Sequence, residues 1–105
     1  MEKPNLSYIK SMSAGDTNFE RRLIRIIKSE FPIEKKSYFE NINAGNYKIT
    51  AGIVHKIKHK ISILGLEKGY EITMAYENDL KEGNNTLQSE FEIILLVVTK
   101  YLKQL

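Results

Sequence analysis

Hydrophobic residues recur every three or four positions along most of the chain, and this spacing constrains the fold more than any other feature. It places hydrophobic side chains on one face of an α-helix, whereas strands require strict alternation. The stretch "EIILLVV" could form a buried strand, but it lies inside a continuous helical period. The sequence therefore predicts an all-α fold, an up-down antiparallel four-helix bundle with a short additional N-terminal helix.

Two segments with a break between them make up the first part of the expected fold. "PNLSYIKSM" is expected to form a short helix that "SAGD" ends. The spacing of Thr17 and Glu20 is that of a capping box, which predicts the start of a second helix. Pro32 is expected to bend or interrupt this helix because proline has no backbone N–H to donate. Gly45, within "NAGN", is a natural residue for its C-terminal end.

Three more helices are expected after Gly45. The third covers about residues 46–64 and stops at Gly65, and the fourth covers residues 66–82, where "GNN" ends it. Asn85 or Thr86 is expected to cap a fifth helix that carries the last hydrophobic stripe.

Composition narrows the class of protein and its location. A chain of 105 residues with 42% hydrophobic and 28% charged residues is typical of a single globular domain, here residues 1–105. It has no cysteine, so disulfides and thiolate metal sites are excluded. The N-terminal stretch lacks the hydrophobic core of a secretory signal, and no hydrophobic run reaches the ~18 residues of a membrane span. We therefore expect a cytoplasmic protein without membrane association.

The stretch "IVHKIKHKISILGL", residues 53–66, holds both histidines of the chain together with three lysines. On a helical wheel at about 100° per residue, His55 points away from the stripe formed by Ile53, Ile57 and Ile61. The residues that surround His55 on the wheel are small or polar: Lys48, Ala51, Gly52, Lys58, His59 and Ser62. A solvated polar face is the simplest interpretation of this pattern.

Three functional interpretations compete with a solvated face. His55 and His59, four residues apart, could bind a metal, although the chain offers no further histidine or cysteine to complete the site. The lysines of this region could bind nucleic acid, but they scatter around the helix and no aromatic residue is interleaved for base stacking. Third, His55 could act as an exposed nucleophile towards a phosphoryl group held by another protein, because its small neighbours leave room for that protein.

Residues 55–65, "HKIKHKISILG", resemble the motif of the histidine-containing phosphotransfer (HPt) domains, which reads approximately H-x-[LI]-K-G-[SA]-x-x-x-[LIV]-G. The stretch "SAGDTNFERRLIRIIKSEFP" is similar to the turn and long helix that precede this motif in the family. "INAGNYKITAGIVHKIK" resembles the run that leads into the histidine. The similarity covers about residues 4–84.

The resemblance implies a phosphocarrier of a multistep two-component phosphorelay. His55 would accept a phosphoryl group from a receiver-domain aspartate and pass it to another receiver, and Lys58 would stabilise the charge of that group. Glu77 stands where the family has the residue that orients the imidazole. Lys48, Ala51, Gly52 and Ser62 would form the partner-binding surface.

The same resemblance implies which partners and cofactors to expect. The partners would be response-regulator receiver domains or a hybrid histidine kinase, with no nucleic acid, and the protein is expected to be a monomer. No cofactor is expected in this chain, since the Mg²⁺ belongs to the receiver. No ATP-binding motif is present, so no kinase activity of its own is expected.

His59 occupies the position at which the family usually has glycine, and Lys60 follows where small residues are common. His59 could donate a hydrogen bond to the phosphoryl oxygens or narrow the approach to His55. A rival hypothesis is a non-catalytic helical interaction module that binds a protein partner or nucleic acid without any transfer.

Overall fold

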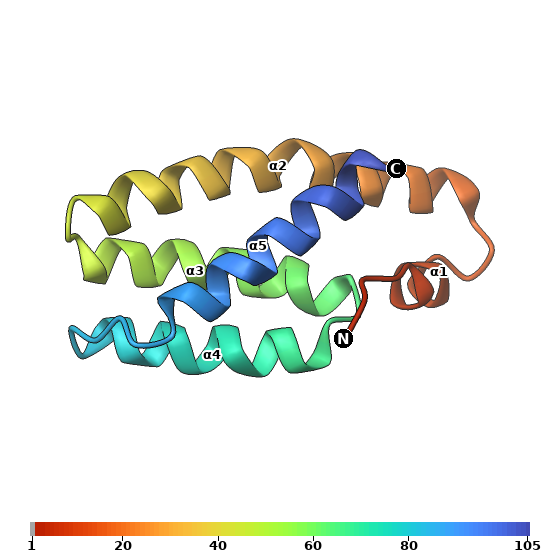
Figure 1. Ribbon diagram of the computed structural model, residues 1–105. Coiled ribbons are helices and arrows are strands. Elements are labelled where there is room, and N and C mark those ends of the chain that lie inside the picture. Colours follow the sequence, from red (N-terminus) through yellow and green to blue (C-terminus); the bar gives the residue numbers. More distant parts are fainter. Residues whose placement is uncertain (1) are drawn as a thin grey trace.

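The computed structural model describes residues 2–105, which form five helices and no strand (Figure 1). The helices are α1 (Ser7–Ser13), α2 (Thr17–Asn43), α3 (Tyr47–Ile63), α4 (Glu67–Lys81) and α5 (Gln88–Lys103). The all-helical prediction is therefore confirmed for this part of the chain, and "EIILLVV" lies within α5. None of the helices described is both long enough and hydrophobic enough to cross a lipid bilayer.

Helices α2, α3 and α4 lie side by side with alternating directions, and α5 crosses them obliquely (Figure 1). The short α1 lies beside the start of α2. Helix α3 contacts both α2 and α4 most extensively, so it carries much of the core. Its side chains Ile57 and Ile61 are fully buried, as the wheel predicts, whereas Ile53 is only partly buried. The remaining face of α3 is free to present polar side chains.

Glycines end the helices where the sequence predicts. Gly45 has φ +75° and Gly65 has φ +80°, a backbone conformation that residues with a Cβ rarely adopt. At Gly65 a Cβ atom would also lie 2.6 Å from Nδ2 of Asn5. The backbone N–H of Asn5 donates to the carbonyl of Leu64, so the N-terminal segment covers the end of α3. The positive φ favours glycine at position 65, and a Cβ there would also displace the Asn5 side chain.

The start and the middle of α2 differ from the sequence-based expectation. Asp16, not Thr17, is the N-cap, and its side chain accepts hydrogen bonds from the backbone N–H groups of Asn18 and Phe19. Pro32 does not interrupt α2, which is one continuous helix of 27 residues. Pro32 and Lys28 are both exposed, so water can satisfy the Lys28 carbonyl that loses its usual donor.

The start of α5 also differs. Leu87 is the N-cap and has no side-chain hydrogen bond, so neither Asn85 nor Thr86 caps the helix. The side chain of Asn84 instead accepts from the backbone N–H of Thr86. The Asn84 side chain therefore stabilises the turn before α5. Short polar side chains can form either such turns or helix caps, and here the turn is formed.

Lys60 is buried between α3 and α2 rather than solvated. Its Nζ lies 3.0 Å from a carboxylate oxygen of Glu30 and 3.0 Å from one of Glu34. Burial by itself would lower the pKa of Lys60, but the two carboxylates outweigh this effect and raise the pKa. The pair of glutamates one turn apart on α2 explains how a lysine fits where the HPt motif has a small residue.

We expect Lys60→Ala to lower the free energy of unfolding by about 2 kcal/mol, because Glu34 would stay largely buried without its cation. About half of the Glu30 side chain is exposed, so water can solvate its carboxylate once the ion pair with Lys60 is lost. Urea unfolding followed by circular dichroism measures the change. Lys56→Ala, at an exposed position on the same helix, should change the stability by no more than about 0.5 kcal/mol. Equal effects of the two substitutions would show that the buried ion pairs do not stabilise the fold.

Candidate functional site: a histidine held by a buried glutamate

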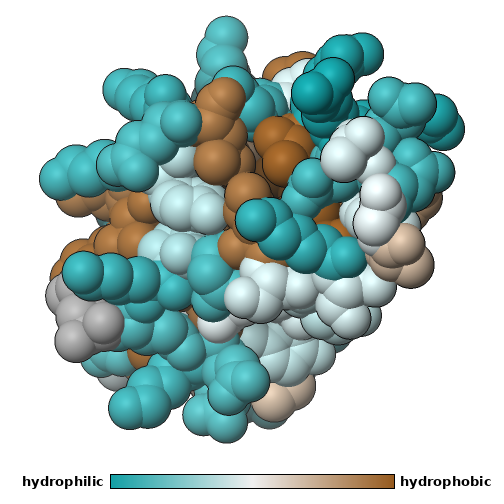
Figure 2. Space-filling model, turned by 90° about the vertical axis from the view of Figure 1, so that its right-hand side faces the viewer, coloured by the Kyte–Doolittle hydropathy of each residue, from teal (hydrophilic) through white to brown (hydrophobic). Residues whose placement is uncertain are grey.

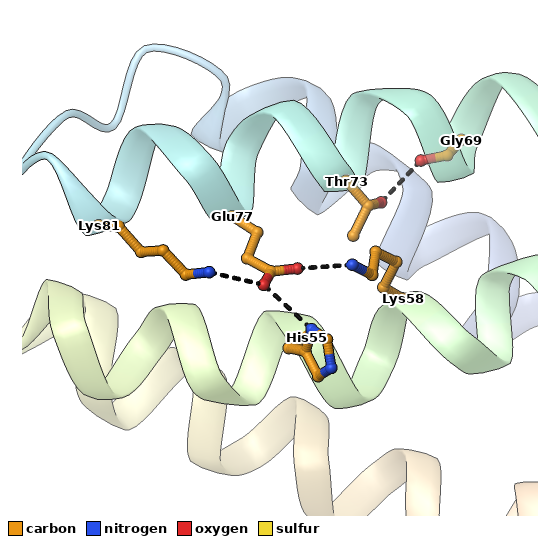
Figure 3. Close-up of polar contacts among 6 residues, drawn as sticks. All are labelled: His55, Lys58, Gly69, Thr73, Glu77 and Lys81. Atoms are coloured by element: carbon orange, nitrogen blue, oxygen red, sulfur yellow. Dashed lines mark hydrogen bonds and ion pairs between the residues drawn. The ribbon is translucent and has the colours of Figure 1, made fainter.

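His55 and Glu77 bring α3 and α4 together at one polar site. Nδ1 of His55 lies 3.0 Å from Oε2 of Glu77 (Figure 3). Half of the His55 side chain is exposed, whereas the Glu77 side chain is only 6% exposed. The helix period directs both residues to the seam between α3 and α4, with His55 at the surface and Glu77 beneath it.

Glu77 contacts two lysines besides His55. Nζ of Lys58 lies 3.0 Å from its Oε1, and Nζ of Lys81 lies 3.2 Å from its Oε2 (Figure 3). Burial would raise the pKa of Glu77, but Lys58, Lys81 and His55 outweigh burial and lower the pKa below its ordinary value. The carboxylate is therefore ionised throughout the neutral range.

An ionised Glu77 determines which nitrogen of His55 carries the proton. A carboxylate only accepts hydrogen bonds, so Nδ1 must be the N–H donor to Oε2. In the neutral ring this places the lone pair on Nε2, which points away from Glu77 (Figure 3). The site thus presents a nucleophilic nitrogen at the surface of the protein, in a ring orientation held by a buried group.

His59 lies one helical turn beyond His55 and is exposed. The two imidazole rings have centroids 4.9 Å apart and are nearly perpendicular, at 89°. This edge-to-face arrangement places His59 against the same ring that Glu77 contacts through Nδ1. A partner that contacts the His55 ring will therefore also lie close to His59.

The surface around His55 is only partly the one that the sequence predicts. Lys48, Gly52 and Ser62 are exposed, and a Cβ added at Gly52 would meet no other atom within 4 Å. Ala51, by contrast, is 2% exposed and belongs to the core. A partner approaching His55 would therefore meet the open backbone at Gly52 but not the side chain of Ala51.

Lys58 is directed into the protein. Its side chain is 12% exposed, and its Nζ lies 5.9 Å from the centroid of the Tyr70 ring in addition to its contact with Glu77. Lys58 and Lys60 thus pair with carboxylates on neighbouring helices. The lysine-rich stretch of α3 is neither a continuous cationic surface nor merely a solvated face.

Within the described residues, no further side chain completes a metal site with His55 and His59. In residues 2–105 no group of three or more histidine, aspartate or glutamate side chains is arranged to hold a metal ion. His55 and His59 approach each other, but Glu77, the carboxylate that contacts His55, is already paired with two lysines.

No known family matches this chain. Comparisons with protein families, with curated proteins and with solved structures all find no match.

Lys81 is the residue of this site that the sequence analysis missed. It lies four residues after Glu77 on α4, a spacing at which a glutamate and a lysine are neighbours on a helix. That spacing is visible in the sequence and could have identified Lys81 once Glu77 had been considered.

Proposed function

We propose that this chain is a histidine phosphocarrier of the HPt type, a four-helix bundle with an additional N-terminal helix that transfers phosphoryl groups between receiver domains. One observation carries the proposal: His55 is half exposed while its Nδ1 lies 3.0 Å from the buried carboxylate of Glu77. A histidine that serves only the core or the solvated surface needs no such partner. A nucleophile that must keep one tautomer and one orientation does.

The transfer step follows from this geometry. The lone pair of Nε2 attacks the phosphorus of an aspartyl phosphate, and the bond between phosphorus and the aspartyl oxygen breaks, with its electron pair leaving on the carboxylate. The ring gains positive charge as the new bond forms, and Glu77 stabilises it through the Nδ1 proton. The Mg²⁺ that assists this chemistry is expected to come with the receiver. The return step to a second receiver is the reverse.

Lys58 has a different part in this proposal from the one expected for a free cation. Its ammonium is paired with Glu77, so its charge acts on the site from beneath His55. It keeps Glu77 ionised, and hence keeps the proton on Nδ1 of His55. Lys58 is thus a positioning residue in the state described, and direct contact with a phosphoryl group would require it to leave Glu77.

The rival hypothesis is an interaction module that binds a partner without transfer. The test is to mix the protein with receiver domains phosphorylated by radioactive acetyl phosphate, taken as a panel from one genome. A phosphocarrier should acquire an acid-labile label from at least one receiver and should transfer it to a fresh receiver. Binding to a receiver without any labelling would support the interaction module instead.

Substitution of His59 will show whether this side chain hinders access to Nε2 of His55 or assists the phosphoryl transfer, because the two cases change the transfer rate in opposite directions. Because the family motif works with glycine at this position, we expect His59 to crowd Nε2, so that His59→Gly and His59→Ala both speed transfer by a few fold. Glycine inside a helix costs about 1 kcal/mol of stability relative to alanine, and the alanine variant controls for that loss.

Transfer rates and phosphohistidine lifetimes should be measured for these variants at about pH 5.5 and about pH 7.5, on either side of the range in which histidine ordinarily titrates. Slower transfer in both variants, with a larger loss relative to wild type in acid, would show that a charged His59 holds the phosphoryl oxygens.

A further inference from the structure

A second surface of the molecule concentrates positive charge. The side of α2 that faces α5 carries Arg21, Arg25, Lys28 and Lys35, and the last turn of α5 adds Lys103. These five cations line two adjoining hollows that share Lys28. One hollow lies between α2 and α5, and the other lies between α2 and Leu105, which follows α5. We call the two hollows together the basic groove. No carboxylate side chain from the described residues 2–105 lines it.

The charge is concentrated because the acidic residues of α2 lie elsewhere. Glu30 and Glu34 belong to the same turns as Lys28 and Lys35, but both contact the buried Lys60 of α3. Within residues 2–105, none of the five groove cations has an ion-pair partner. Lys35 donates a hydrogen bond of 2.9 Å to the hydroxyl of Thr99, which joins α2 to α5. Within the described residues, no ion pair therefore neutralises the positive charge of these five side chains.

The floor of the groove is hydrophobic. Ile24, Phe31, Pro32 and Leu102 lie between the cations. Figure 2 views the molecule from the end where α2 begins and α5 ends, and it shows hydrophilic side chains projecting around hydrophobic atoms that lie deeper. A ligand that fits would thus combine negative charge with hydrophobic side chains.

The length of the groove indicates the size of such a ligand. From Arg21 to Lys35 the chain rises by about 21 Å along α2, because each helical residue adds about 1.5 Å. A partner helix of about fourteen residues spans this distance, and carboxylates at its three- and four-residue spacing would match Arg21, Arg25 and Lys28. The hydrophobic face of the partner helix would lie on the floor.

Two other classes of polyanion fit less well. Single-stranded nucleic acid binds where exposed aromatic rings stack on bases, but the one aromatic residue of the floor, Phe31, is buried. Anionic membranes attract clusters of cations together with hydrophobic side chains that project outwards, whereas Phe31 and Leu102 of the groove are buried and Ile24 is partly buried.

We propose that the basic groove between α2 and α5 binds an acidic amphipathic helical segment of a protein partner. This site differs from the one at His55, since α5 crosses in front of α3 in Figure 1 and lies behind α3 and α4 in Figure 3, where His55 faces the viewer. A partner in the groove would leave His55 accessible, so the proposal does not depend on phosphotransfer.

The test uses a fluorescent 16-residue peptide with blocked ends, built from glutamate, leucine and alanine so that glutamates flank a leucine stripe. Fluorescence anisotropy measures its affinity for the whole chain. A peptide of the same composition in scrambled order, an oligothymidine of matched charge and vesicles containing phosphatidylserine serve as competitors. We expect the amphipathic peptide to bind at least about tenfold more tightly than its scrambled form, with affinity falling as salt is added.

The variant Arg25→Glu/Lys28→Glu reverses two groove charges and should weaken peptide binding by about tenfold or more. Lys10→Glu/Arg22→Glu makes the same change in net charge outside the groove and should leave the affinity within about twofold. Circular dichroism confirms that both variants are folded. Equal loss in both variants, no preference for the amphipathic order, or stronger groove-dependent binding of the oligonucleotide or the vesicles would each overturn the proposal.

Discussion

His55→Gln is expected to abolish labelling of the chain by a phosphorylated receiver. Glutamine offers no nitrogen lone pair that can attack phosphorus, so no phosphoryl bond can form at position 55. The side chain is half exposed, and Glu77 keeps its two lysines after the substitution. The free energy of unfolding should therefore stay within about 1 kcal/mol of the wild-type value. Labelling with phosphorylated receiver, read after gel separation at neutral pH, measures the loss.

His59→Gln is the matched control, because it removes the other exposed histidine of α3 one turn away. It should change the rate of labelling but not the final extent. A protein that is still labelled after His55→Gln but unlabelled after His59→Gln would show that His59 is the acceptor. Labelling that survives both substitutions would place the phosphoryl group on another residue type.

The second large effect is expected at Glu77. Glu77→Ala removes the acceptor for Nδ1–H, so the ring of His55 can rotate and can place its proton on either nitrogen. Loss of a group that orients a histidine typically costs 10–100-fold, and we expect transfer to slow by about that factor. Stability should fall by about 2 kcal/mol, because Lys58 stays largely buried without its carboxylate. Rapid-quench transfer kinetics and urea unfolding measure the two losses.

Two variants separate orientation from charge at this site. Glu77→Gln keeps an oxygen that can accept from Nδ1–H but loses the negative charge and both ion pairs, so it should transfer faster than Glu77→Ala and more slowly than wild type. Lys81→Ala removes only a contact whose lysine is 58% exposed, and it should have little effect on either quantity. If Glu77→Ala transfers as fast as wild type while folded, the contact between His55 and Glu77 has no role in the reaction.

The lowered pKa of Glu77 also makes the free energy of unfolding depend on pH. Because its pKa is lower in the folded protein than the ordinary value of about 4.3, the unfolded chain binds the proton more tightly. The stabilisation by Glu77 is thus present above about pH 4.3 and is lost as the pH falls through the folded pKa. The free energy of unfolding should decline less steeply with acid in Glu77→Gln than in wild type.

The sequence alone identified most of the local structure, because local structure depends on neighbours along one helix. The 3.6-residue period predicted the helices, and Gly45 and Gly65 marked their ends by the backbone conformation that only glycine adopts freely. Where several polar residues compete for one role, the prediction was wrong. Asp16 rather than Thr17 caps α2, and Leu87 follows a turn that uses the polar residues expected to cap α5.

The sequence also placed His55 on the polar face of α3, and the HPt resemblance directed attention to Glu77, twenty-two residues away. Only the tertiary structure decided what each charge contacts. Lys58 and Lys60 stand two residues apart, yet one pairs with α4 and the other with α2. A helical period determines the direction of a side chain around its own axis. The rotation and offset of neighbouring helices, which packing of their buried faces sets, determine which partner that side chain meets.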